Sequence, residues 1–178
     1  MIIGKKVILD IPEEKHLSKM LEWRNDPEFR QYYREYRVLS YENQLKWWKD
    51  KILNDDTWQY FVFKPIDEDE IAGVIGLTYI HPVYKTAEFA ICVDKNCRNN
   101  GYGSDALRTI IKYGFEQLNL NRIWCEVYGN NKAIDVYRHI GFKDEGILRQ
   151  TVFKNGEYLD SYVLGMLKSD YIKIKEKF

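Results

Sequence analysis

The sequence predicts one α/β domain over residues 1–178, built on a mixed, mostly antiparallel sheet of about seven strands. Three observations predict this class. Segments with strand composition follow one another in the first half of the chain. Residues 87–103 read as a strand, a tight polar turn with two glycines and the start of a helix. Near the end, Asn155-Gly156 joins two further strand-like segments.

The N-terminal part combines one strand with two helices. Residues 7–11 have strand composition, and Pro12 ends the strand. A helix is expected from Glu13 to about Asp26-Pro27, because apolar residues recur there on one side. A second helix is expected after Ser40, which is a favourable N-cap residue.

Arginines and tyrosines interleave in residues 29–38, between these two helices. An exposed, charged loop explains this composition. A lip over a substrate site explains it as well, and we favour the lip.

The middle of the chain predicts the core of the sheet. Residues 58–64 and 71–80 precede the strand at Ala87, and these three strands form an antiparallel run. Residues 122–128 follow the next helix, so a right-handed crossover places them parallel to the Ala87 strand. That helix has one apolar face, formed by Leu107, Ile110, Ile111, Phe115 and Leu118.

The C-terminal part predicts a short helix and a hairpin. The helix follows a polar hinge at 129–131 and ends at Gly141, which suits the C′ position. Two strands, 146–154 and 157–167, are joined by Asn155-Gly156, a sequence that favours a type I′ turn.

The turn at 98–103 (RNNGYG) has the composition of a phosphate-binding loop. Gly101 and Gly103 allow a sharp turn in which several N–H groups point the same way. The helix that follows adds unpaired N–H groups and the positive end of its dipole, and Arg98 adds charge. A diphosphate is therefore a candidate ligand, although glycine-rich turns also occur only because the chain must turn.

A dinucleotide site is a rival interpretation of the same residues. Gly101, Gly103 and Ala106 fit the pattern G-x-G-x-x-G/A, and the acidic Glu126 follows a little over twenty residues later. That pattern normally opens the first strand–helix unit of a longer alternating chain. Here a large mixed segment precedes it, which argues against an NAD-binding oxidoreductase.

Composition excludes several other classes. The formal net charge is zero, so neither a nucleic-acid nor a membrane-surface partner is indicated. No segment is apolar for long enough to span a membrane. The cysteines and histidines lack disulfide or metal-ligand spacing, so we expect no metal site and a reducing cytoplasm. These residues are Cys92, Cys97, Cys125, His16, His81 and His139.

Two motifs together resemble the GNAT superfamily of acyl-CoA-dependent N-acetyltransferases. The first, [Q/R]-x-x-G-x-[G/A] after the fourth strand, is matched by residues 98–103. The second, N-x-x-A-x-x-x-Y-x-x-x-G-F after the fifth strand, is matched by Asn130, Ala133, Tyr137, Gly141 and Phe142. Residues 23–27 (WRNDP) and the final hairpin are similar to the branch with ribosomal-protein N-terminal, polyamine and nucleotide-amino-sugar acetyltransferases.

The resemblance implies a sheet with helices on both faces, whose parallel fourth and fifth strands splay apart around acetyl-CoA. Loop amides would hold the pyrophosphate, and backbone groups of the fourth strand would pair with the pantetheine arm like an added strand. The residues implied in cofactor binding are Ile91, Val93, Arg98, Asn99, Asn100, Gly101, Tyr102, Gly103, Ser104, Asn130 and Ala133.

The resemblance also implies direct attack of a neutral amine on the thioester in a ternary complex. Tyr137 would protonate the leaving thiolate, since a tyrosine pKa of about 10 and a thiol pKa of about 8.5 make this transfer only mildly uphill. Glu88 is the candidate general base, and Glu126 competes with it. The alternative interpretation of Glu88 is an ordinary carboxylate on the strand surface or a partner for a nearby arginine. Cys97 lacks the paired base that an acyl-carrying nucleophile needs.

The acceptor stays open at this stage. A protein N-terminus, a polyamine, a nucleotide-linked amino sugar and an aminoglycoside are all candidates. Arg30, Arg34 and Arg37 lean toward an acceptor with negative charge. We include a homodimer among the expected assemblies, and a non-catalytic acyl-CoA sensor among the alternative functions.

Overall fold

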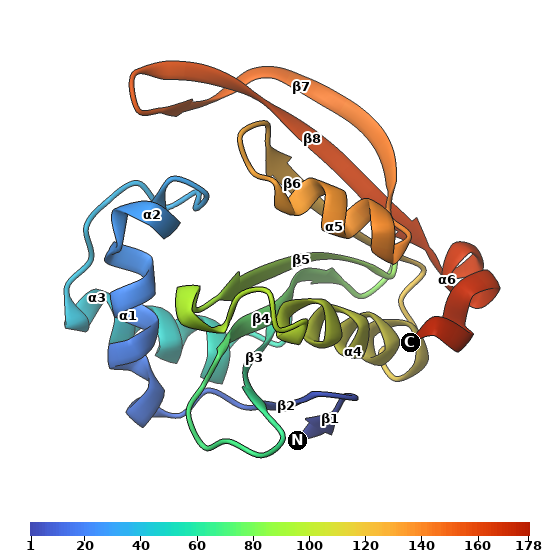
Figure 1. Cartoon of the computed structure of the whole chain (residues 1–178), viewed down its shortest axis with the longest axis horizontal. Coiled ribbons are helices and arrows are strands. Elements are labelled where there is room, and N and C mark those ends of the chain that lie inside the picture. Colours follow the sequence, from blue (N-terminus) through green and yellow to red (C-terminus); the bar gives the residue numbers. More distant parts are fainter.

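The computed structural model describes residues 1–178 as eight strands in one sheet, ordered β1-β2-β3-β4-β5-β6-β8-β7 (Figure 1). All neighbouring strands are antiparallel except β5 and β6, which are parallel. The prediction of about seven strands missed only β1, a two-residue edge strand. The strands are β1 (Ile2–Ile3), β2 (Val7–Asp10), β3 (Gln59–Pro65), β4 (Gly73–His81), β5 (Thr86–Val93), β6 (Arg122–Tyr128), β7 (Lys143–Lys154) and β8 (Glu157–Leu167).

Six α-helices accompany the sheet. They are α1 (Leu17–Asn25), α2 (Pro27–Arg30), α3 (Tyr41–Trp47), α4 (Tyr102–Glu116), α5 (Ala133–Ile140) and α6 (Lys168–Ile174). A π-helical turn extends α3, and short 3₁₀ turns lie at 14–16, 95–97 and 175–177. The sequence did not predict α2 and α6, because a helix of four or seven residues is too short to show a period.

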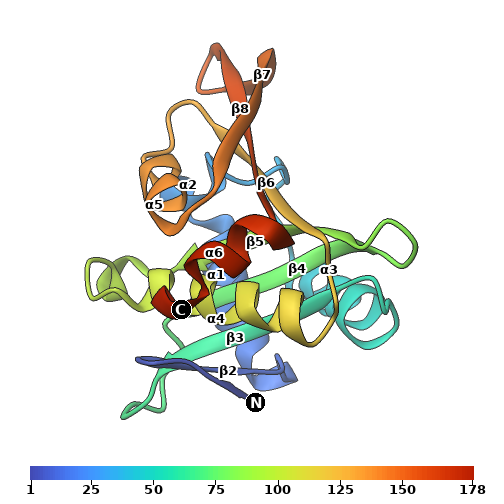
Figure 2. The same ribbon diagram turned by 90° about the vertical axis from the view of Figure 1, so that its right-hand side faces the viewer.

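Helices cover both faces of the sheet, as predicted. The apolar face of α4 packs on one side in a core that includes Ala87 and Phe89 of β5. On the other side, α1 and α2 pack against a second cluster that includes Cys92 of β5. Odd and even positions of β5 therefore serve different cores, as the alternation of a strand requires. Figure 2 shows α1 and α4 on different sides of the β3–β5 region.

The two parallel strands separate soon after they meet. Only three residue pairs join them, Thr86–Arg122, Ala87–Ile123 and Glu88–Trp124. Beyond this junction β5 continues beside β4 as far as Val93, and β6 continues beside β8. In Figure 1 their ribbons diverge. The prediction of parallel, splayed strands is therefore confirmed.

The β7–β8 hairpin forms an arm that reaches over α2 in Figure 1. Asn155 (φ 52°) and Gly156 (φ 88°) both have positive φ, as the predicted type I′ turn requires. Most of β7 is exposed. Large apolar side chains on the arm are open to solvent, namely Ile147, Leu148, Phe153 and Tyr158.

All three cysteines are free thiols. None of the helices has the length and apolar character needed to span a membrane.

Candidate active site

The turn between β5 and α4 presents unpaired backbone donors. None of the N–H groups from Arg98 to Ser104 donates a hydrogen bond within the protein; the next one, of Asp105, bonds the Gly101 carbonyl at 3.0 Å. The first N–H groups of a helix have no partner inside it, which leaves them free for an anion. The turn therefore has the donors that a diphosphate needs.

Two glycines give this turn its shape. Gly101 has φ 81° and precedes the first residue of α4. A Cβ on Gly103 would lie 2.7 Å from Cγ2 of Val93, so only glycine lets α4 begin this close to β5. Asn99 also has positive φ, at 65°. The residues present thus fit the pyrophosphate of acetyl-CoA.

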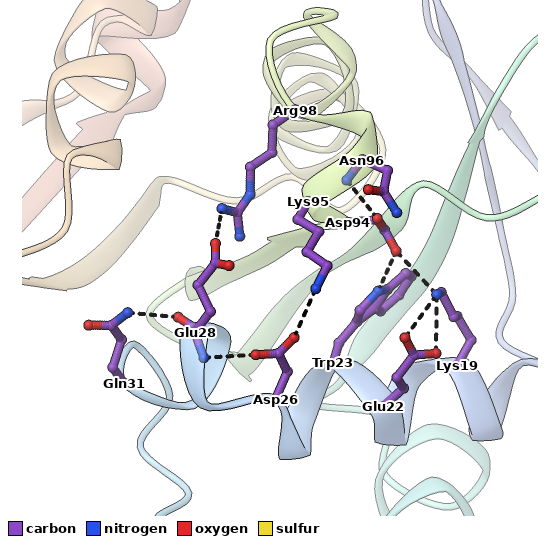
Figure 3. A network of polar contacts seen from close by, with 10 residues as sticks. All are labelled: Lys19, Glu22, Trp23, Asp26, Glu28, Gln31, Asp94, Lys95, Asn96 and Arg98. Carbon is purple, nitrogen blue, oxygen red and sulfur yellow. Dashed lines mark hydrogen bonds and ion pairs between the residues drawn. The ribbon is translucent and has the colours of Figure 1, made fainter.

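The Arg98 side chain contacts α2. Its guanidinium forms an ion pair with Glu28 of α2 (Figure 3). The guanidinium also lies 4.8 Å from the centroid of the Phe29 ring. Its charge is therefore already neutralised by α2, and its backbone N–H is the group left for a phosphate.

The WRNDP motif explains how α1 and α2 are fixed to this turn. Trp23 Nε1 donates to Asp94 at 2.7 Å, and Asp26 pairs with Lys95 at 3.6 Å (Figure 3). Burial by itself raises the pKa of Asp94, but hydrogen bonds from Asn96, Trp23 and Lys19 outweigh it and lower that pKa. Asp94 is thus held as a carboxylate that joins α1 to the end of β5.

Where β5 and β6 separate, they leave an opening between them, and the unpaired edge of β5 faces it. Asp94 N–H bonds Ala72 on the β4 side, whereas the Lys85 carbonyl accepts from Arg122 on the β6 side. Backbone groups alternate sides along a strand, so those of Ile91 and Val93 point toward β6 and have no strand partner there. An extended pantetheine arm fits such an edge.

The opposite flank of the opening is the loop between β6 and α5. Asn130 is exposed there, and Ala133 begins α5. The sequence motif did not single out Asn131, whose Oδ1 accepts a hydrogen bond from Ala133 N at 3.0 Å in an Asx turn that leads into α5.

Tyr137 projects from α5 against β5. Its ring meets Phe89 edge-on at 5.0 Å between centroids, and the residue is buried. Burial raises the pKa of Tyr137 above its ordinary value, so the hydroxyl stays protonated at neutral pH. This hydroxyl makes no hydrogen bond within the protein.

Glu88 lies on the other face of β5, where both of its oxygens are held by Arg34. Arg34 Nη1 donates to Oε2 at 2.9 Å and Nη2 to Oε1 at 2.5 Å. Nη2 also donates to Glu126 of β6 at 3.0 Å, and Ser161 donates to Glu126 at 2.6 Å. Arg34 therefore joins the two candidate bases; the sequence offered a nearby arginine as a partner for Glu88 but did not identify which one.

Arg34, which contacts both candidate bases, belongs to residues 29–38, the segment predicted to be a lip. The interleaved arginines were the available signal, but nothing in the sequence pairs one of them with a particular carboxylate. The structure thus brings Glu88, Glu126 and Arg34 together on one face of the sheet and places Tyr137 on the other.

Comparisons with known proteins identify the family of this chain and several relatives. A family profile described as "Acetyltransferase (GNAT) domain" matches residues 6–143. A spermidine N(1)-acetyltransferase of Escherichia coli (strain K12) is 32% identical over 69% of this chain and 66% of its own length, just under two thirds. A spermidine N(1)-acetyltransferase of Vibrio cholerae is 30% identical over 71% of this chain and 73% of its own. A putative ribosomal N-acetyltransferase of Bacillus subtilis is 30% identical over 70% of this chain and 71% of its own.

Solved structures show the same fold. The Vibrio cholerae spermidine N-acetyltransferase in complex with CoA and spermine superimposes with a TM-score of 0.86 and 26% identity, covering 94% of this chain and 98% of that one. A dodecameric structure of the same enzyme has a TM-score of 0.82 and 25% identity, covering 95% of this chain and 98% of that one.

The family match confirms the predicted resemblance to the GNAT superfamily. The chain belongs to the acetyltransferase (GNAT) domain family.

Proposed function

We propose that this protein transfers the acetyl group of acetyl-CoA to a primary amine of a small cationic molecule of the polyamine type. The curated relatives named for spermidine support this choice over a protein N-terminus. The local charge supports it too. Glu88 and Glu126 neutralise Arg34, and Glu35 pairs with Arg37, so the lip is less positive than its sequence indicates.

One observation carries the proposal: unpaired N–H groups at 98–104 lie at one end of a strand edge that is itself unpaired. A diphosphate at the first and an extended amide arm along the second would direct a thioester toward the junction of β5 and β6.

The side chains at the junction suit direct attack. The amine nitrogen bonds to the carbonyl carbon, the C–S bond breaks, and the sulfur takes a proton from Tyr137. Glu88, directly or through water, takes the proton that the amine loses, with Glu126 as the competing base. Tyr137 and Glu88 lie on opposite faces of β5, which suits an amine that arrives on one face and a thiol that is protonated on the other.

Thiol release from acetyl-CoA tests the proposal directly, with spermidine, a monoamine, an aminoglycoside, an amino sugar nucleotide and a peptide with a free N-terminus as acceptors. We expect the highest kcat/KM with spermidine. The highest value with the peptide would instead favour N-terminal acetylation, which the Bacillus subtilis relative suggests.

CoA binding without thiol release from any acceptor would favour the sensor alternative. Acetyl-CoA, but not NAD(H), should raise the melting temperature, because a ligand selective for the folded state stabilises it.

We also propose that the chain assembles with copies of itself through the β7–β8 arm. The exposed apolar residues of the arm and the dodecameric Vibrio cholerae structure support this assembly.

A further inference from the structure

Arg34 bridges the two strands of the opening just beyond their last pair. Glu88 is paired in register with Trp124, and Glu126 follows two residues later on β6. The Arg34 guanidinium donates to both carboxylates, at distances from 2.5 to 3.0 Å. A cationic group of the protein itself therefore occupies the face of the junction that carries the candidate bases.

The carboxylates of Glu88 and Glu126 are held in place by burial or by a further hydrogen bond, whereas the Arg34 side chain is partly open to solvent. The Glu88 side chain is only 8% exposed, and Glu126 accepts a hydrogen bond from the fully buried Ser161. The Arg34 side chain is 50% exposed. Because half of the Arg34 side chain faces solvent, an incoming cation can take its place beside the two carboxylates, and the buried Glu88 is then not left without a positive partner.

The backbone around Arg34 is anchored at both ends and free between them. Lys154 of the hairpin arm donates to the carbonyls of Arg30 (3.2 Å) and Tyr33 (2.7 Å). At the other end, Leu39 N donates to the Asn25 side chain at 2.8 Å. From 34 to 38 no residue makes a backbone–backbone hydrogen bond. This segment can therefore change conformation without breaking secondary structure.

We infer that Arg34 occupies the place of the acceptor's cationic nitrogen and competes with the acceptor for Glu88 and Glu126. The inference rests on the proposed function, because it concerns the amine of that reaction. An acceptor binds only when Arg34 has left, so its apparent affinity is reduced by the fraction of molecules in which Arg34 is engaged. Arg34 is thus a specificity-determining residue, which favours acceptors with enough positive charge to displace a guanidinium.

Calorimetric binding of spermidine to the full-length protein saturated with CoA tests this inference without turnover. Arg34→Gln removes the competitor and keeps a polar side chain, so we expect spermidine to bind about tenfold tighter or more. Arg34→Lys keeps the charge but loses the forked pair, so its affinity should lie between those of the wild type and Arg34→Gln. Arg37→Gln, the same charge change on the same segment, should match the wild type.

Spermidine affinity that is unchanged or weaker in both Arg34 variants would overturn the inference, as would an equal gain in Arg37→Gln. If Arg34→Gln does not fold, Arg34→Lys carries the test alone. The proposed function fails in a different way, when no amine releases thiol from acetyl-CoA although Arg34→Gln binds spermidine more tightly.

Discussion

The candidate acid and base differ in how the protein holds them. Tyr137 is surrounded by aromatic and aliphatic side chains, which keep its hydroxyl neutral and leave it without a partner. Glu88 instead accepts a hydrogen bond from the Arg34 guanidinium at each of its two carboxylate oxygens. The candidate acid is thus free of partners within the protein, whereas the candidate base is engaged by a cation.

Replacing Tyr137 with Phe removes the hydroxyl and keeps the ring against Phe89. We expect kcat to fall roughly 10²- to 10⁴-fold, the usual contribution of a positioned acid, while the Kd for CoA stays within about twofold. Steady-state kinetics and calorimetry on the same preparation measure both. Unchanged turnover would mean that Tyr137 only packs.

The pH profile follows from the raised pKa of Tyr137. An acid is active while protonated, so its contribution is lost only as pH rises through its pKa, and burial moves that pKa above the ordinary value of about 10. Between pH 7 and 9.5, kcat/KM for the amine should rise, because more of the amine is neutral. A descending limb centred below about pH 9.5 would contradict the assignment.

At the scale of elements, the start of α4 is the part of the site that depends most on backbone geometry. Gly103→Ala places a methyl group against Val93 and pushes the helix away from β5. We expect a loss of stability of about 1–3 kcal/mol and a CoA affinity at least about tenfold lower. Urea unfolding and calorimetry measure the two effects.

Gly146→Ala on β7 is the matched control, since a methyl group at that position would meet no atom within 4 Å. Equal effects of the two substitutions on CoA affinity would show that the close approach of α4 to β5 is not what shapes the binding site.

These elements also show what the sequence predicts well. Features that depend only on residues close in sequence lie where they were expected. They are the two glycines of the turn (Gly101 and Gly103), the Asn155-Gly156 turn and the apolar face of α4. The pairing of Arg34 with Glu88 joins residues 54 positions apart, and that of Trp23 with Asp94 joins residues 71 apart. Composition and periodicity carry no information about contacts between residues so far apart in the sequence. The sequence therefore predicted a lip but not the residues that it contacts.

At the scale of the whole molecule, the β7–β8 arm is the least covered part of the sheet. Phe153 and Tyr158 pack on each other at 4.9 Å between centroids, yet both remain exposed. An exposed edge strand with apolar side chains is a site for pairing with another chain.

The double substitution Ile147→Ser with Phe153→Ser tests the proposed assembly. We expect wild-type protein at tens of micromolar to sediment as an oligomer and the variant to shift toward monomer. Each substitution should lower the free energy of unfolding by less than about 0.5 kcal/mol, because both side chains are exposed. Arg149→Ser, exposed on the same strand, should sediment like the wild type. A monomeric wild type would end the proposal.

The junction of only three residue pairs between β5 and β6 has a consequence for the free protein. Bending there lets the two parts of the sheet move relative to each other while every remaining ladder stays intact. Amide hydrogens of Ile91 and Val93 should then exchange with heavy water faster than those of their β4-bonded neighbours. The pantetheine arm of bound acetyl-CoA would hydrogen-bond to this edge, so we expect hydrogen exchange at both amides to slow together.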